Sequence, residues 1–408
     1  MKTETQLVTG IDIGTTRVRT IICENDEKGL PVFLGHGSAP AEGMKRGVIV
    51  NMEKAIQSIS RSVEDAELMA GVHIESAVVS LAGDHIKSIN SHGVIGIAHS
   101  ENEIDERDVN KAIEAASAVA IPTDREIIHV LPQEYTIDEQ TGIKNPIGMS
   151  GVRLEVEVHI VTAAVTSVKN IYRALKRCEI EVEHLVMQSL ASSYASISSE
   201  EEEMGVVLLD IGGDLTDIAI FFDGSIRHTG VLSLGGKNVT NDITIGLRTT
   251  LDQAEKIKIG YGSALASLVD PDDMMEVGGV AGREPRSISR NVLATIIEPR
   301  MEEILSLTAR EVKKSNPPDS LTAGVILTGG AATLPGVVEL VEQIFDMPAK
   351  LGTPIGVDGF PESLSISEYA TAIGLINYGV RHDSDQKFAK GKISKMFKKI
   401  ENWFTDNF

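Results

Sequence analysis

A repeated stretch of sequence constrains the fold of this chain more than any other feature. The segment VTGIDIGTTRVRTII at residues 8–22 resembles VVLLDIGGDLTDIAI at residues 206–220. Each has an apolar run ending in Asp-Ile-Gly, a short polar turn and a second run with alternating apolar positions, which predicts a β-hairpin. Because the copies lie about half the chain apart, we interpret them as a duplicated domain and not as a solenoid array.

The composition fits an α/β protein in a reducing compartment. Hydrophobic residues make up 42% of the 408 residues but aromatic residues only 4%, which disfavours an aromatic-rich β-sandwich. The two cysteines, Cys23 and Cys178, are too few for a disulfide framework and lack metal-ligand spacing. The net charge of −21 disfavours nucleic-acid binding, because phosphates would repel the protein. The polar start lacks the layout of a signal peptide, and no apolar run approaches the roughly 20 residues that span a bilayer.

Helices and strands are predicted to alternate around the two hairpins. The predicted helices span residues 52–70, 105–120, 167–178, 238–259 and 291–314, with two helices rich in small residues at 188–195 and 367–375. The predicted strands span residues 76–83, 127–138 and 151–164. We interpret residues 198–205 as a solvated acidic turn and residues 381–391 as a polar linker.

The two Asp-Ile-Gly turns are candidates for one binding device. A glycine after a strand-ending aspartate lets backbone N–H groups approach a ligand, because no Cβ is in the way. Asp12 and Asp210 would lie on opposite walls of a cleft and hold Mg²⁺, mostly through its waters. The phosphates would be gripped by Gly14, Thr15, Thr16, Gly212 and Gly213. One such turn alone is more often a plain strand end, but the repeat and a third glycine turn, LTGGAATLPG, favour a binding site.

Two other phosphate-binding motifs are missing from the sequence. It contains no GxxxxGK[ST], which disfavours a P-loop protein, and no GxGxxG opening a βαβ unit, which disfavours a Rossmann site.

The order of these motifs carries a resemblance. Two Asp-Ile-Gly hairpins, two small-residue helices and a Gly-Gly turn resemble the superfamily of actin, sugar kinases and heat-shock chaperones. Within it, GVRLEVEVHIVTAA and the amphipathic C-terminal segment resemble the FtsA family of bacterial cell-division proteins, over essentially the whole chain. The resemblance implies an α/β fold with duplicated actin-like (ribonuclease-H-like) domains around a nucleotide cleft, an FtsA-type inserted subdomain and a C-terminal amphipathic helix. The two small-residue helices would cross at the hinge.

The resemblance also implies subdomain boundaries. The first core subdomain would comprise 1–82 and 162–190, and the inserted subdomain 83–161. The second core subdomain would comprise 191–225 and 300–380, with an outer subdomain at 226–299. A linker at 381–391 would lead to a membrane-targeting helix at 392–408.

Site residues follow from the resemblance in the same way. ATP and Mg²⁺ would be the cofactors, with the metal at Asp12 and Asp210. The nucleotide would contact Gly14, Thr15, Thr16, Gly212, Gly213, Asp214, Thr216, Gly236, Lys237, Asn238, Glu255, Lys258, Gly329, Gly330 and Ala331. Gln188 matches the water-orienting residue of actins and would act with Asp210, although capping of a strand–helix junction explains it equally well. Glu255 and Lys258 match an E-x-x-K that touches ribose and adenine in chaperones, the alternative being a surface ion pair.

Asp214 departs from the family pattern, in which a third glycine is usual at this position. Its carboxylate would repel the terminal phosphate unless Mg²⁺ or a lysine intervenes. We therefore expect a clamp that holds ATP weakly or turns it over slowly, as in an ATP-gated scaffold. Replacing Asp214 by glycine should raise affinity or turnover, and no change would mean that the side chain points into solvent.

The C-terminal segment KISKMFKKIENWFTDNF, residues 392–408, predicts a helix that lies on an anionic membrane. Its membrane-contacting residues would be Ile393, Met396, Phe397, Ile400, Trp403 and Phe404, with Lys395, Lys398 and Lys399 largely elsewhere on the helix. The lysines exclude a membrane-spanning helix but attract anionic lipid headgroups. Docking on the protein's own core or on a partner is the alternative.

The resemblance finally implies a cytoskeletal adaptor. Such a protein polymerises at the cytoplasmic face of the inner membrane, at the division septum, tethers the FtsZ ring and recruits later division proteins. The FtsZ contact maps to Arg286, Arg290 and Arg300, although pairing with Glu298 and Glu302 explains these arginines equally well. Enzymatic activity would be at most a weak Mg-dependent ATPase. The alternatives are a pilus-assembly actin-like adaptor and a small-molecule kinase, which would need a general base and has no use for a basic tail.

Overall fold

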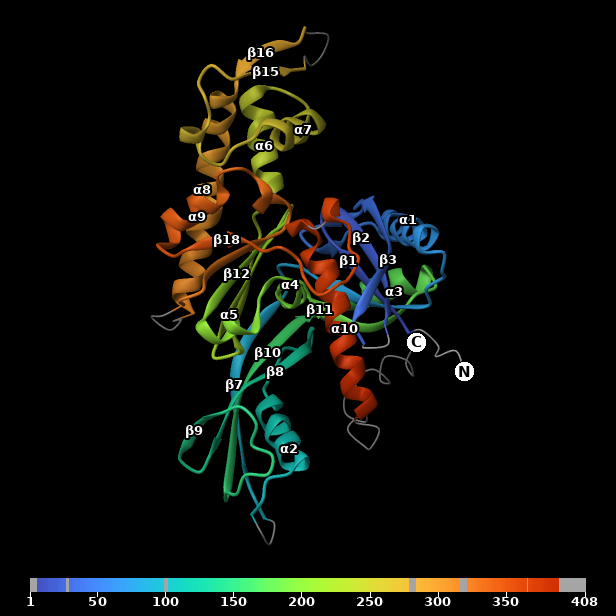
Figure 1. Ribbon diagram of the computed structural model, residues 1–408, viewed down its shortest axis with the longest axis vertical. Helices are drawn as coiled ribbons and strands as arrows, with labels where there is room; N and C mark the ends of the chain where they lie inside the picture. The colour runs from blue at the N-terminus through green and yellow to red at the C-terminus, as the bar shows by residue number, and fades with distance from the viewer. Residues whose placement is uncertain are drawn as a thin grey trace.

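The computed structural model describes residues 6–26, 29–98, 102–278, 284–315, 321–364 and 366–388. Figure 1 shows two five-stranded sheets in the middle of the molecule, a four-stranded sheet at the lower end and a group of helices at the upper end. Within the described residues, no helix is both long and apolar enough to cross a membrane.

The first five-stranded sheet is built around the first Asp-Ile-Gly hairpin. β1 (Leu7–Ile13) and β2 (Arg17–Asn25) form this hairpin, and β3 (Pro31–Pro40) pairs antiparallel with the outer edge of β2. On the other side of β1, β6 (Ser76–Leu81) and β11 (Glu181–Met187) follow as parallel strands. The strand order is therefore β3-β2-β1-β6-β11.

The second five-stranded sheet repeats this arrangement. β12 (Val206–Ile211) and β13 (Thr216–Phe222) form the second hairpin, and β14 (Ser225–Leu232) pairs antiparallel with β13. β17 (Gly324–Thr328) and β18 (Ala349–Leu351) follow as parallel strands on the other side of β12. The order β14-β13-β12-β17-β18 matches the first sheet strand for strand, which confirms the predicted duplication.

Helices cover the two sheets, and local sequence signals set where they begin and end. The first helix begins where the Asn51 side chain accepts the Lys54 N–H, and ends where Gly71 adopts a left-handed conformation with φ of 69°. Its buried face packs on β2 and β3. The covering helices are α1 (Met52–Ala70) and α3 (Val165–Arg177) in the first half, and α8 (Arg290–Lys314) and α9 (Val337–Phe345) in the second.

The two small-residue helices pack against each other between the halves. α4 (Gln188–Ser196) contacts β12 and β13 of the second sheet, and α10 (Ala370–Phe388) contacts β1 and β6 of the first. Their backbones approach so closely that a Cβ added to Gly374 would lie 1.7 Å from the carbonyl oxygen of Ala191. The structure confirms the expected close crossing, because a glycine is needed at this contact.

The four-stranded sheet has a core of its own. Its order is β7 (Lys87–Gly96), β10 (Arg153–Ala164), β8 (Arg125–Ile137) and β9 (Gln140–Ile143), all antiparallel. α2 (Glu106–Ser117) packs on β7 and β10. β7 and β8 also contact β14, so this sheet is attached to the edge of the second five-stranded sheet.

The upper end of the molecule is formed by short elements gathered around the first part of α8 (Figure 1). They are α6 (Gly236–Leu247), α7 (Leu251–Tyr261), η1 (Ala266–Leu268), β15 (Met274–Val277) and β16 (Arg286–Ser289). Of these, α6, η1 and β16 contact α8. The remaining elements are β4 (Met44–Lys45), β5 (Val48–Ile49), α5 (Ser199–Met204), η2 (Gly330–Thr333), η3 (Glu362–Leu364) and η4 (Ser367–Tyr369).

Three predicted elements differ from the structure. The acidic segment 198–205 is largely helical, because Ser198 and Glu201 form reciprocal capping hydrogen bonds that stabilise α5. The single helix predicted at 238–259 is two helices, because Arg248 takes a left-handed conformation with φ of 44° and Thr250 caps α7. The polar segment predicted to be a linker from residue 381 continues α10 as far as Phe388, since no proline or glycine interrupts it. The predicted membrane helix, 392–408, lies outside the described residues.

Candidate functional site

The two Asp-Ile-Gly turns meet each other where the halves come together. The backbone N–H of Asp214 donates to the hydroxyl of Thr15 over 3.1 Å. A Cβ added to Gly213 would lie 2.1 Å from the hydroxyl oxygen of Thr16, so any larger residue would force the Thr16 side chain to move. Each turn closes with the same internal hydrogen bond, from Gly14 to the carbonyl of Arg17 and from Gly212 to the carbonyl of Leu215. The duplicated turns thus face each other as a pair, as the sequence predicted.

Asp12 lies at the end of β1, with 4% of its surface exposed. It accepts a hydrogen bond of 2.9 Å from Ser80, and its carboxylate is 4.0 Å from the guanidinium of Arg19. Burial raises the pKa of Asp12 to about 6, although Arg19 and Ser80 lower it, and the nearby Asp210 raises it further.

Asp210 occupies the equivalent position at the end of β12 and is also buried. Ser192 of α4 donates to its carboxylate over 2.6 Å, and Thr371 of α10 donates over 3.2 Å. Gln188, the first residue of α4, hydrogen-bonds to the same carboxylate. Burial raises the pKa of Asp210, and the three hydrogen bonds lower it. The crossing helices therefore fix this carboxylate, and Gln188 is placed beside it.

Asp217 was missed by the sequence reasoning. It pairs with Asp210 in the β12–β13 register, is fully buried, and neither of its carboxylate oxygens has a hydrogen-bond partner within the described residues. Burial raises its pKa well above the usual range, and the neighbouring Asp210 and Asp12 raise it further. The signal was available, because a second aspartate follows the Gly-Gly turn directly before the apolar run IAIFF.

These carboxylates make the site receptive to a cation. Their mutual repulsion and the orphaned oxygens of Asp217 are features that a bound cation would relieve. Within the described residues, however, no three His, Cys, Asp or Glu side chains are close enough together to form a metal site. A cation at this site would have to take most of its ligands from water and phosphate, as hydrated Mg²⁺ does.

The third glycine turn, at residues 327–336, lies beside Asp210. Gly329 has φ of 87°, and a Cβ added to it would lie 2.5 Å from the carboxylate of Asp210. Gly330 follows at the start of η2, near the carboxylate of Glu368. A Cβ added to Gly236 would lie 3.1 Å from the Cβ of Ala331, so the N-terminus of α6 lies against this turn.

The predicted E-x-x-K pair lies against the start of α6. The Lys258 ammonium is 2.8 Å from the carboxylate of Glu255 and donates to the Gly236 carbonyl over 3.1 Å. Asn238 accepts the N–H of Gly235 with its side chain, which caps α6. Thr216 is fully buried and donates to the carbonyl of Leu234, so its hydroxyl supports the loop from within the protein.

Comparisons with known proteins identify the family. Residues 207–374 match the family model described as cell division protein FtsA, and residues 83–162 match the model of an SHS2 domain inserted in FTSA. The cell division protein FtsA of Pseudomonas aeruginosa is 44% identical over 380 residues, which cover 93% of this chain and 91% of that protein. The chain belongs to the FtsA family. Its role in cell division and the predicted family are thereby confirmed.

Solved structures confirm the actin-like fold of this FtsA-family chain. A PilM–PilN type IV pilus biogenesis complex matches with a TM-score of 0.67 and 19% identity, covering 91% of this chain and 98% of that one. MreB5 of Spiroplasma citri bound to AMPPNP matches with a TM-score of 0.55 and 16% identity, covering 98% of this chain and 99% of that one. With the inserted SHS2 domain, these likenesses confirm the predicted fold class.

The three arginines predicted to contact FtsZ are each engaged within the FtsA-family chain. Arg286 donates to the carbonyl of Leu247, and Arg290 pairs with Asp273 at 2.6 Å. Arg300 pairs with Asp242 at 2.5 Å and also with Glu303. The acidic partners therefore differ from Glu298 and Glu302, which the sequence suggested.

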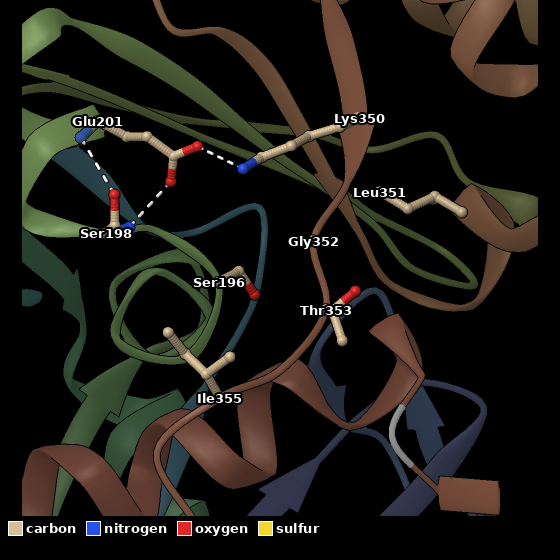
Figure 2. A pocket seen from close by; sticks show the side chains of 8 residues that line it. All are labelled: Ser196, Ser198, Glu201, Lys350, Leu351, Gly352, Thr353 and Ile355. Atoms are coloured by element: carbon tan, nitrogen blue, oxygen red, sulfur yellow. Dashed lines mark hydrogen bonds and ion pairs between the residues drawn. The ribbon is translucent and has the colours of Figure 1, made fainter. Parts of the chain in front are cut away.

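A pocket of about 340 Å³ lies away from the predicted site residues (Figure 2). Ser196 ends α4, whereas Gln188 begins it beside Asp210, so the pocket lies at the opposite end of this helix. Glu201 of α5 and Lys350 of β18 form an ion pair across one side of it. The lining residues are Ser196, Ser198, Glu201, Lys350, Leu351, Gly352, Thr353 and Ile355.

Proposed function

We propose that this FtsA-family protein binds ATP with Mg²⁺ between its two Asp-Ile-Gly turns. The observation that carries the proposal is the direct apposition of residues 14–16 and 212–214 beside three buried carboxylates of raised pKa. Backbone N–H groups of turns without a bulky side chain suit phosphate oxygens. Mg²⁺, held through its waters by Asp12, Asp210 and the orphaned Asp217, would neutralise phosphate charge.

The nucleoside would lie beside the start of α6 and the third glycine turn, which are in contact with each other. Gly236 and Lys258 approach this region from one side, and Gly330 and Ala331 from the other. Gly330 is exposed and has no Cβ, which leaves its backbone accessible to a flat base or a ribose. The Lys258 ammonium already donates to Gly236, Thr240 and Glu255, so a ribose hydroxyl would replace one of these acceptors, whereas the Glu255 carboxylate can accept from a ribose hydroxyl.

We propose that nucleotide occupancy matters more than turnover in this protein. Gln188, which would orient the attacking water, hydrogen-bonds to Asp210. This bond holds the Gln188 side chain against the carboxylate and limits its freedom to orient a water molecule, which favours slow hydrolysis. The protein would be at most a weak Mg-dependent ATPase, and mainly a scaffold.

The scaffold would act at the cytoplasmic face of the membrane. Family membership supports a role at the division septum, and the basic amphipathic sequence at 392–408 supports peripheral attachment to anionic lipid. We propose that the protein polymerises there, tethers FtsZ through the segment that carries Arg286, Arg290 and Arg300, and recruits later division proteins through the inserted subdomain at 83–161. Because Arg286, Arg290 and Arg300 have internal partners, FtsZ would have to compete for them.

Reconstitution on liposomes tests the adaptor function. The full chain should carry FtsZ from the same organism onto vesicles containing anionic lipid, in a cosedimentation assay with ATP. A chain lacking residues 392–408 should neither bind the vesicles nor carry FtsZ onto them, but should still bind nucleotide. Undiminished vesicle binding by the truncated chain would contradict membrane attachment through this segment. Rapid phosphorylation of a small substrate would instead favour a kinase.

A further inference from the structure

Asp214 lies in the second Asp-Ile-Gly turn, which we call the second phosphate turn, the first being at residues 14–16. Its carboxylate is directed at donors from both halves of the protein. The ammonium of Lys237, at the start of α6, is 3.1 Å from one carboxylate oxygen. The other oxygen accepts the backbone N–H of Arg46 over 2.9 Å. Since only 14% of the Asp214 side chain is exposed, it does not point into solvent.

Lys237 connects the halves a second time. Besides pairing with Asp214, its ammonium donates to the carbonyl of Thr15 over 2.7 Å, and the backbone N–H of Asp214 donates to the Thr15 hydroxyl. Asp214, Lys237, Thr15 and Arg46 therefore form one hydrogen-bonded group, which we call the clasp. It links the second phosphate turn to the first phosphate turn and to the β4–β5 turn.

The β4–β5 turn offers its N–H from a fixed position. Arg46 and Gly47 both have positive φ, of 48° and 75°. A Cβ added to Gly47 would lie 2.6 Å from the backbone of Ala82, so this turn packs tightly on the segment after β6. The Arg46 N–H is thus held toward the cleft by backbone packing.

The donors in the clasp are those that a phosphate anion would seek. A lysine ammonium and a backbone N–H at the mouth of a glycine turn are typical phosphate ligands. In this chain a carboxylate already occupies both of them. A terminal phosphate entering between the turns must displace Asp214 or be repelled by it.

We propose that Asp214 is an internal competitor of the terminal phosphate and sets the preference of this site between nucleoside triphosphates and diphosphates. The inference rests on the proposed nucleotide binding. A triphosphate takes Lys237 and the Arg46 N–H from Asp214 and thereby opens the clasp. A diphosphate leaves the clasp closed. The residue thus couples the state of the nucleotide to the contact between the two halves.

Nucleotide affinities of matched variants test this competition. Asp214→Asn keeps the side-chain volume and an oxygen that can accept the Arg46 N–H, but removes the charge. It should tighten binding of the triphosphate analogue AMP-PNP with Mg²⁺ by about tenfold, the scale of one charged hydrogen bond, and change ADP binding less than threefold. Asp65→Asn on the exposed face of α1 removes the same charge elsewhere and should change neither affinity.

A double-mutant cycle separates competition from simple repulsion. If Asp214 competes for Lys237, the gain from Asp214→Asn should disappear in a Lys237→Met background. An undiminished gain there would overturn the inference, as would equal gains for AMP-PNP and ADP. Calorimetric titration of the full chain gives all the affinities.

The amide resonance of Arg46 gives a readout that does not depend on affinity. In NMR spectra AMP-PNP should shift this resonance, because a phosphate oxygen replaces the Asp214 carboxylate as acceptor of the Arg46 N–H, whereas ADP should leave it unchanged. Equal shifts with both nucleotides, or none with either, would overturn the inference while leaving the proposed function intact. If neither nucleotide binds any variant at millimolar concentration, the proposed function itself fails, and this inference fails with it.

Discussion

The crossing of α4 and α10 makes a sharp prediction about Gly374. Replacing Gly374 by alanine adds a Cβ 1.7 Å from the carbonyl oxygen of Ala191 and 2.6 Å from its carbonyl carbon. An ordinary carbon–oxygen contact is about 3.3 Å, so the helices must separate by roughly 1.5 Å. The obstacle is backbone and not the end of a flexible side chain, so neither helix can relieve it by a rotamer change. We expect the free energy of unfolding to fall by about 3 kcal/mol, the upper part of the range for overpacked cores.

Urea denaturation followed by far-ultraviolet circular dichroism measures this change. Gly260→Ala is a matched control, since Gly260 lies within α7 and an added Cβ would meet nothing within 4 Å. It should raise the free energy of unfolding by about 0.5 kcal/mol, because alanine favours a helix over glycine. If Gly374→Ala lies within about 0.5 kcal/mol of the wild type, the crossing is not the close contact described above.

Two further predictions concern the cleft and the pH dependence of stability. Gly213→Val should weaken AMP-PNP binding at least thirtyfold, or about 2 kcal/mol, because the valine side chain would occupy the position of the Thr16 hydroxyl. Unchanged affinity in calorimetry would refute the placement of the phosphates between the two turns. His129 is buried, accepts the N–H of Met187 over 3.0 Å, and has its pKa lowered to about 3 chiefly by burial. Between pH 6.5 and 3, His129 is therefore protonated in the unfolded state but not in the folded state. The free energy of unfolding should keep its full value above pH 6.5 and fall by up to about 1.4 kcal/mol per pH unit below it. His129→Gln should reduce this slope in acid-denaturation curves, whereas His73→Gln, with a 73% exposed side chain, should not.

The sequence predicted those parts of the fold that depend on local signals. Both hairpins follow from strands of alternating or continuous apolar residues joined by turns with glycines. The helix α1 follows from its apolar spacing and from Gly71, whose left-handed conformation ends it. The break between α6 and α7 was missed because the left-handed residue there is Arg248, for which such a conformation is uncommon.

The site was predicted less completely because its chemistry depends on contacts between distant segments. Asp12 and Asp210 stand at strand ends before glycines, where a sequence pattern can find them. Asp217 gains its significance from burial beside Asp210, its partner in the second hairpin, and near Asp12, which only the packing of the halves brings close. The sequence of its own turn does not show why Asp214 carries a negative charge beside a phosphate site. The structure shows that its carboxylate pairs with Lys237 and accepts the Arg46 N–H, which belong to other segments of the chain.

The central claim, that the paired turns form a nucleotide site, is tested most directly by a crystal structure of the full chain with Mg²⁺ and AMP-PNP. The account predicts the phosphates between residues 14–16 and 212–214, with the metal on the side of Asp12, Asp210 and Asp217. It also predicts the base beside Gly330 and Lys258. A nucleotide bound elsewhere, such as in the pocket between α4 and β18, or phosphates that touch only one of the two turns, would contradict it.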